Sequence, residues 1–344
     1  MKLADRTIAP APHGSGPYII AEIGVNHDGS SDRALELVEA AAAAGADAVK
    51  LQLFRAETLL SRAAVLADYQ AKNGAVDPFS MLRGLELEPD AMRAVYDRAR
   101  ARGLHAIITV FSRELITMAE ALGVDAYKTA SPDVINRPLL QDLVRTGRPL
   151  LVSTGTATLA EVARAAAWLN THPHLFLHCV SAYPTPDEEA SLAARQAMLE
   201  VTSRALGYSD HTSSLDTGAL AVASGACLLE KHLTYDRNAS GPDHAASFDP
   251  DQFAEYVRLA HRAWRMLGAP VKEVRDVERE VHRISRQSIV VRHDLPAGHA
   301  LTESDLTVKR PGTGLPPAQL EAVLGRPLAR SVTGDTPLLE EDLA

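Results

Sequence analysis

The sequence predicts a (β/α)8 barrel (TIM barrel) followed by a small C-terminal domain. Short apolar runs alternate with helical patterns eight times between residues 18 and 268, which is typical of a parallel sheet. Eight such units match the roughly 250 residues of a closed barrel. After residue 285 this alternation stops, and short strands with frequent Pro and Gly follow. We therefore expect a barrel over residues 1–269, a linker over 270–285 and a small domain over 286–344.

Eight apolar segments are the expected barrel strands. A doubly wound open sheet would have a similar pattern, but no Gly-rich dinucleotide-binding loop follows the first segment, which favours closure into a barrel. The segments are 18–24, 48–54, 105–111, 126–130, 149–154, 175–181, 204–210 and 227–233.

Helical patterns lie between these strands. In the segment 32–45, Asp32 is an expected N-cap and Gly45 an expected C-terminal stop. The segment 88–103 has the same plan, with a proline near its start and a glycine at its end. Both segments therefore have the local signals of surface helices that cover a barrel.

The C-terminal region is different. Segment 270–285 is strongly charged and predicts a linker helix. Beyond it, "AGHALTESDL" (297–306) is echoed loosely by "TGDTPLLEEDL" (333–343), which is one residue longer. A domain of about 60 residues has marginal stability alone, so packing on a barrel or on a partner subunit would help it.

Composition excludes several classes of protein. The net charge of −9 argues against a nucleic-acid surface. No apolar run is long enough to span a membrane, and the first residues lack the apolar core of a signal peptide. The two cysteines, Cys179 and Cys227, lie in apolar strand segments and form no disulfide framework. We therefore expect a cytoplasmic protein without membrane or nucleic-acid partners.

Polar residues gather at the carboxyl ends of the expected strands, where barrels place their chemistry. Lys50 and Gln52 share one face of their strand, as Glu230 and His232 do, whereas Lys231 points the other way and is interpreted as structural. The polar set at these ends is Glu22, Lys50, Gln52, Thr109, Lys128, Ser131, Asp133, Ser153, His178, Tyr183, Ser209, His211, Glu230 and His232.

The residue types in this set indicate an anion site. Lys50 and Lys128, with the hydroxyls of Ser131, Ser153 and Ser209, form a cradle suited to phosphate or carboxylate. Glu22 is a candidate base. Gln52, Asp133, Tyr183 and Asp243 are candidates for contacts with a polyhydroxyl substrate.

Two histidines indicate a metal. His211 and His232 end adjacent strands, and two imidazoles with oxygen groups nearby favour Mn²⁺ or a similar ion over a closed zinc site. Mg²⁺ and Co²⁺ are the alternatives. Such an ion polarises a carbonyl or positions water.

Several long strings resemble the sialic acid (nonulosonic acid) synthases. They are "YIIAEIGVNHDGS", "KLQLF", "TVFSRE", "LLVSTG", "LHCVSAYPTP", "GYSDHT" and "EKHLTYDRNASGPDH". The tail "QSIVVRHDLPAGHALTESDLTVKRPGTGLPP" resembles the antifreeze-like (SAF) domain of these enzymes, which has a β-clip fold. The resemblance covers residues 17 to 344 in order.

The resemblance implies an N-acetylneuraminate synthase-like transferase. Such an enzyme condenses phosphoenolpyruvate with an N-acetylated aminosugar aldehyde, such as N-acetylmannosamine, and gives a nine-carbon 2-keto sugar acid and phosphate. Glu22 would assist proton transfer, His211 and His232 would hold the metal, and the sugar would meet Gln52, Asp133, Tyr183 and Asp243. The phosphoenolpyruvate site would comprise Lys50, Thr109, Lys128, Ser131, Ser153 and Ser209.

The same resemblance implies a homodimer in which each SAF domain covers the partner's barrel and Arg310 contacts the acetamido group. The acceptor itself stays open, because Asp133 stands where these synthases often have Glu, and Thr156 where Met is usual. A diacetamido-trideoxy hexose of the legionaminic or pseudaminic type, or a spore-coat-type sugar, is the alternative to N-acetylmannosamine. The roles of Glu230, His178 and His244 are also open.

Three rival interpretations remain. Other phosphoenolpyruvate-condensing barrels act on phosphorylated sugars, but they lack the C-terminal domain. A Schiff-base aldolase would use Lys128 as its nucleophile. A scaffold with an ice-binding module would need a flat, Thr-rich face, whereas this tail has scattered threonines and several charges.

Overall fold

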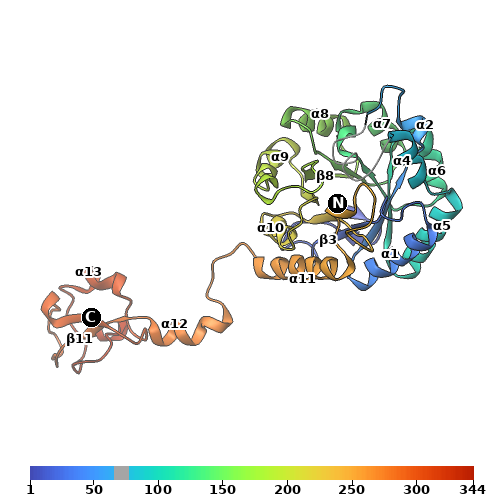
Figure 1. The fold of residues 1–344 in the computed structure, drawn as a ribbon. Coiled ribbons are helices and arrows are strands. Elements are labelled where there is room, and N and C mark those ends of the chain that lie inside the picture. Colours follow the sequence, from blue (N-terminus) through green and yellow to red (C-terminus); the bar gives the residue numbers. More distant parts are fainter. Residues whose placement is uncertain (66–76) are drawn as a thin grey trace. The chain divides into compact units, whose positions relative to one another are not determined.

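The computed structural model describes residues 1–65 and 77–344, which divide into two compact units, Met1–Pro270 and Val271–Ala344. The first unit is a closed barrel of parallel strands, with the connecting helices arranged around it (Figure 1). The barrel closes where β10 pairs with β3. Its strands are β3 (Tyr18–Glu22), β4 (Ala48–Leu53), β5 (His105–Val110), β6 (Ala126–Thr129), β7 (Leu150–Ser153), β8 (His174–Cys179), β9 (Leu206–Asp210) and β10 (Leu228–His232).

The predicted barrel is confirmed. Each expected strand coincides with an observed one, with boundaries that differ by no more than two residues. The largest apolar cluster lies between the outer face of the barrel and the helices, as parallel sheets require. These helices are α1 (Ser31–Ala43), α5 (Pro89–Ala101), α6 (Ile116–Ala121), α7 (Arg137–Arg145), α8 (Leu159–Leu169), α9 (Ala194–Thr202), α10 (Thr217–Ala223) and α11 (Pro250–Leu267).

One predicted helix cap is wrong. The N-cap of α1 is Ser30 rather than Asp32, because the Ser30 backbone is extended and its side chain accepts a hydrogen bond from the Arg33 N–H. Asp32 lies inside the first turn, where its charge is favourable for the helix dipole. Gly45 follows the C-cap with φ of +85°, the left-handed conformation expected of a glycine stop.

The amino-terminal end of the barrel is closed by apolar side chains. Tyr18, Ile20, Ile107 and Leu151 belong to an interior cluster that also includes Leu3 from the N-terminal hairpin of β1 (Lys2–Leu3) and β2 (Arg6–Thr7). Since this end is filled, the interior can open only at the carboxyl ends of the strands.

An insertion after β4 departs from the regular alternation. It contains the short helix α2 (Ala56–Leu59) and helix α4 (Pro78–Leu85), which precede α5. Asp77 caps α4 by accepting hydrogen bonds from Phe79 N and Ser80 N. Leu85 packs against Val25 and Phe54, which follow the carboxyl ends of β3 and β4, in a separate apolar cluster.

The second unit contains helix α12 (Arg279–Ser285), strands β11 (Ser288–Val291) and β12 (Leu306–Lys309), and helix α13 (Leu320–Val323), around its own apolar core. The expected linker helix is α-helical only over α12 and follows a 3-10 turn, Asp276–Glu278. The sequence echo corresponds to two similar turns. Asp305 accepts a hydrogen bond from Thr302 N, and Asp342 accepts one from Leu339 N, both at 2.8 Å.

Among the described residues, no helix has both the length and the apolar character needed to cross a membrane.

Candidate functional site

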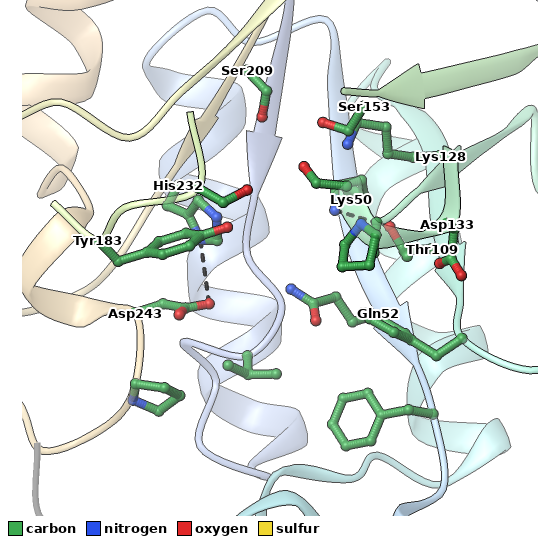
Figure 2. A pocket seen from close by; sticks show the side chains of 18 of the residues that line it. Lys50, Gln52, Thr109, Lys128, Asp133, Ser153, Tyr183, Ser209, His232 and Asp243 are labelled. Carbon is green, nitrogen blue, oxygen red and sulfur yellow. Dashed lines mark hydrogen bonds and ion pairs between the residues drawn. The ribbon is translucent and has the colours of Figure 1, made fainter. Parts of the chain in front are cut away.

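A cavity of about 530 Å³ opens at the carboxyl ends of the barrel strands. Figure 2 shows Lys50, Thr109, Lys128 and Ser153 on one side of this space and Tyr183, His232 and Asp243 on the other. Glu22 and Arg310 are the two predicted site residues that do not line it. Those that do are Lys50, Gln52, Thr109, Lys128, Ser131, Asp133, Ser153, Tyr183, Ser209, His211, His232 and Asp243.

Lys50 and Glu22 form a buried ion pair on neighbouring strands. The Lys50 Nζ contacts Glu22 Oε2 and donates to Thr109 Oγ1 at 3.0 Å. Burial raises the pKa of Glu22 to about 7, although the Lys50 cation opposes this shift. Burial also lowers the pKa of Lys50, but the carboxylates of Glu22 and Glu230 outweigh it, so that pKa lies above its ordinary value. Glu22 can therefore exchange a proton near neutral pH beside a fixed cation.

Lys128 belongs to a second buried charge group. Its Nζ donates to Thr129 O at 3.0 Å and lies 3.4 Å from Glu230 Oε1, which also accepts from Ser209 Oγ at 3.0 Å. Burial lowers the pKa of Lys128. Burial would raise the pKa of Glu230, but Lys128 and Lys50 bring it below its ordinary value. Glu230 is thus the ion-pair partner of Lys128 and also favours the charge of Lys50, a role that residue type alone could not assign.

Hydroxyl groups complete the base of the cavity. Thr109, Ser131, Ser153 and Ser209 are all buried lining residues. A Cβ atom on Gly155 would lie 2.2 Å from Ser181 Oγ and 2.7 Å from Ser131 Oγ, so only glycine lets these two hydroxyls reach the cavity. Two cations surrounded by hydroxyl donors can bind a phosphate and a carboxylate together.

Cys179 is a neighbour of the site that the sequence analysis treated as an apolar strand residue. It is buried behind the cavity wall, where Ser131 Oγ lies 3.5 Å from its Sγ and His211 Nδ1 lies 3.7 Å away. Strand alternation could have predicted that Cys179 faces the barrel interior, because it follows the inward-facing Leu177 by two residues.

The opposite wall is aromatic. The ring centroids of His211 and His232 are 5.5 Å apart, and Tyr183 packs on His211 at 4.2 Å. Asp243 Oδ2 lies 3.6 Å from His232 Nδ1 (Figure 2). Burial lowers the pKa of His232 well below its ordinary value and raises the pKa of Asp243 to about 6. The neutral form of His232, which can act as a ligand, is therefore favoured. Burial also lowers the pKa of His211, but Cys179 and the Val180 carbonyl outweigh it, so that pKa lies above its ordinary value.

The buried Nδ1 of His232 has no hydrogen-bond partner among the described residues, whereas His211 Nδ1 lies 2.8 Å from Val180 O. Two neighbouring imidazoles fit part of a divalent metal shell. Within residues 1–65 and 77–344, however, no three His, Cys, Asp or Glu side chains form a metal-binding group. Any such ion would need water or substrate as its other ligands.

Gln52 and Asp133 lie farther along the cavity wall. Gln52 Nε2 donates to Gly24 O at 3.0 Å, and Asp133 accepts from Asn136 Nδ2 at 3.1 Å. Burial raises the pKa of Asp133. Each side chain keeps hydrogen-bonding capacity for a hydroxylated ligand.

The sequence analysis missed an apolar wall near the cavity mouth. Phe54 and Phe111 meet edge to face with ring centroids 5.9 Å apart, and α2 and α4 bring further apolar side chains beside them. Phe54 follows Gln52 by two residues, so strand alternation was the signal that could have revealed it. The wall consists of Val25, Phe54, Leu59, Leu60, Met81, Leu82, Leu85 and Phe111.

Two other polar strand residues face away from the cavity. His178 Nε2 lies 3.0 Å from Ala190 O, and its ring stacks on Tyr208. Lys231 contacts Asp210 and the ring of Phe248, which agrees with its structural interpretation. Arg310 is an exposed residue of the second unit, directly after β12.

Comparison with known proteins places these residues in a family. Residues 37–272 match the NeuB family, and residues 286–344 match the SAF domain. The chain is 36% identical to the N,N'-diacetyllegionaminic acid synthase of Legionella pneumophila, over 96% of each chain. It is 35% identical to the protein of the same name from Campylobacter jejuni, over 90% of this chain and 94% of that one.

A solved structure has the same architecture. The N-acetylneuraminic acid (sialic acid) synthetase of Leptospira borgpetersenii matches with a TM-score of 0.74 and 30% identity, over 82% of this chain and 94% of that one. The sequence resemblance is thus confirmed at the level of the family. The chain belongs to the NeuB family and ends in a SAF domain.

Proposed function

We propose that this protein condenses phosphoenolpyruvate with an N-acetylated aminosugar aldehyde. C3 of phosphoenolpyruvate forms a bond to the aldehyde carbon, water adds at C2, and phosphate leaves as the C2–O bond breaks. The observation that carries the proposal is the buried pair Lys50 and Lys128, ringed by hydroxyls at the closed end of the cavity. This arrangement suits the phosphate and carboxylate of one small anion.

The favoured acceptor is a diacetamido-trideoxy hexose rather than N-acetylmannosamine, our first expectation. The two relatives named as N,N'-diacetyllegionaminic acid synthases support this choice. The apolar wall supports it independently. The trideoxy sugar has a methyl group and a second acetamido methyl where N-acetylmannosamine has hydroxyls, and a hydroxyl placed against Phe54 and Phe111 would lose its hydrogen bonds to water.

Each part of the cavity has a separate task in this reaction. Lys50 and Lys128, with Thr109, Ser131, Ser153 and Ser209, bind phosphoenolpyruvate. Glu22, whose pKa is about 7, lies behind Lys50 and accepts a proton from the Lys50 ammonium as Lys50 takes up the proton of the attacking water. Gln52, Asp133, Tyr183 and Asp243 bind the sugar.

His211 and His232 would hold a divalent metal, with Mn²⁺ as the first choice and Mg²⁺ or Co²⁺ as alternatives. The buried Nδ1 of His232, which has no hydrogen-bond partner within the described parts of the chain, and the neutral state favoured for that ring support this assignment. When bound, such an ion supplies Lewis-acid polarisation of a carbonyl oxygen.

We also propose a homodimer in which Arg310 reaches the partner's acceptor site. Segment 271–285 supports a partner subunit, because its apolar side chains are exposed and would be covered by one. They are Val271, Val274, Val277, Val281 and Ile284. The two cysteines are buried and unpaired, which suits a reducing, cytoplasmic location.

The test is phosphate release from phosphoenolpyruvate in the presence of Mn²⁺. N-acetylmannosamine and two diacetamido-trideoxy hexoses, the precursors of legionaminic and pseudaminic acid, are compared with and without a chelator. We expect chelator-sensitive release that is fastest with a trideoxy sugar. Faster release with N-acetylmannosamine would overturn the acceptor, and borohydride trapping of pyruvate on Lys128 would overturn the reaction class in favour of an aldolase.

A further inference from the structure

The loop after β3 contains the string "VNHDG" (25–29), to which the proposed reaction gives no task. This loop runs beside the segment 233–247, which follows β10 and carries Asp243. Asn26 and His27 are buried, and Asp28 has φ of +49°. The contacts of Asn26 and Asp28 cross from one loop to the other.

Asn26 joins both ends of the second loop. Its buried Nδ2 donates to Leu233 O at 2.9 Å and to Ser247 Oγ at 2.8 Å. Ser247 Oγ in turn donates to Asp243 O at 2.6 Å. A single amide therefore connects the start of the second loop to the backbone of Asp243.

Asp28 binds the middle of the second loop. Its Oδ1 lies 2.9 Å from the Nε2 of the fully buried His244, and its Oδ2 accepts from Tyr235 Oη at 2.8 Å. Arg33 donates to the same carboxylate at 2.5 Å and stacks over the Tyr235 ring at 4.2 Å. His244 Nδ1 lies 2.7 Å from Thr234 Oγ1, so the contact continues into the second loop.

The first loop is itself held on its other side. A Cβ atom on Gly29 would lie 2.4 Å from Gly84 O at the end of α4, and Gly29 has φ of +74°. Only glycine allows this approach. The loop carrying Asn26 and Asp28 therefore spans from the apolar wall on α4 to the segment that carries Asp243.

We propose that Asn26 and Asp28 are positioning residues that latch segment 233–247 to the barrel rim and so hold the Asp243 carboxylate at the cavity. His244, whose role the sequence left open, is the side chain through which Asp28 acts. The kinetic consequence rests on the proposed function, because Asp243 is there assigned to the sugar. The structural consequence does not depend on turnover.

The first experiment is amide hydrogen exchange on Asp28→Asn. Asparagine tolerates the positive φ at this position, so the variant removes the charge while keeping the backbone. We expect exchange in peptides covering 233–247 to become about tenfold faster, the effect of losing one charge-assisted hydrogen bond. Asp32→Asn, an exposed acid in the first turn of α1, is the matched control. Unchanged exchange in 233–247 would overturn the latch.

Kinetics separate positioning from general damage. Asp28→Asn and Asn26→Ala should each raise the KM for the diacetamido-trideoxy hexose by about tenfold and leave the KM for phosphoenolpyruvate unchanged. In an Asp243→Ala background, Asp28→Asn should have no further effect on the acceptor Kd measured by calorimetry. If the effects of Asp28→Asn and Asp243→Ala on the acceptor Kd were fully additive, the latch would be overturned. If the unmodified protein turned over no acceptor, the proposed function would fail, and the exchange experiment would still decide the latch.

If Asn26→Ala or Asp28→Asn does not fold, Tyr235→Phe serves as the milder variant. It removes only the hydroxyl that donates to Asp28. A smaller but measurable rise in exchange over 233–247 is expected, and no rise there would count against the latch.

Discussion

Lys231 and Lys128 are both buried lysines of the barrel strands, and substitution by methionine should mainly lower stability at Lys231 and mainly weaken phosphoenolpyruvate binding at Lys128. Lys231 and Asp210 are both 0% exposed, and Lys231 Nζ lies 3.6 Å from Asp210 Oδ1. In Lys231→Met, Asp210 would keep only its two 2.8 Å hydrogen bonds from Thr212. A buried carboxylate left without its counter-ion costs about 3–5 kcal/mol. At about 2–4 °C per kcal/mol, the Tm should fall by roughly 10 °C.

Lys128→Met should cost less stability than Lys231→Met. Glu230 would lose its ion pair with Lys128, but it would keep the nearby Lys50 cation, which also lowers its pKa, and its hydrogen bond from Ser209. The loss should appear in binding. One charge-assisted hydrogen bond contributes about 1.5–3 kcal/mol, so the affinity for phosphoenolpyruvate should fall about 10- to 100-fold.

Thermal unfolding and calorimetric titration with phosphoenolpyruvate measure the two effects. Lys272→Met, which replaces an exposed lysine outside the barrel unit, is the control for loss of a charge. The double variant Lys231→Met/Asp210→Asn should recover part of the lost stability, because the uncompensated charge is gone. A Lys231→Met protein with unchanged Tm, or a Lys128→Met protein with unchanged affinity, would refute the assignment of the two lysines.

Three further predictions concern the metal, the second unit and the acceptor. Mn²⁺ should raise the Tm of the unmodified protein and not that of His232→Ala, and an equal rise in both would remove His232 from the metal site. Hydrogen bonds from His299 and Thr302 lower the pKa of Asp305, so its stabilising effect on the second unit is present above the unfolded pKa near 3.9 and is lost at lower pH. Asp305→Asn should lower the free energy of unfolding at pH 7 by about 1–2 kcal/mol and flatten the acid side of the stability curve; equal acid sensitivity in both proteins would contradict this. Arg310→Ala should raise the acceptor KM and leave the phosphoenolpyruvate KM unchanged, and an unchanged acceptor KM would exclude Arg310 from the site.

Strand alternation explains most of what could be predicted. Since side chains two apart share a face, the cavity-facing positions of Lys50 and Gln52, and of Glu230 and His232, follow from the sequence once a barrel is assumed. His178 shows where the sequence analysis failed to apply this rule. We grouped it with the polar residues at the strand ends, but its neighbour Leu177 faces the interior, so His178 points outward.

Other features depend on geometry that no local pattern contains. The N-cap at Ser30 was assigned to Asp32 because both residue types cap helices, and only the backbone angles distinguish them. The apolar wall lies partly on an insertion outside the regular alternation, so nothing in the sequence related α4 to the cavity. The pairing of Glu230 with Lys128 joins strands far apart in the chain.

The order of side chains along β4 has a consequence for how such an enzyme can change over evolution. Lys50 and Gln52 of β4, and Phe54 directly after the strand, line the same cavity in the order cation, amide, aromatic ring. In the proposed reaction, donor binding and acceptor selectivity would thus belong to different levels of this segment. Under the proposed function, a mutation of Phe54 would alter which sugar is accepted while the donor end keeps its charges, so new acceptors could be explored without rebuilding the catalytic chemistry. For protein engineering, the same separation makes Phe54 and the apolar wall around it the positions to randomise.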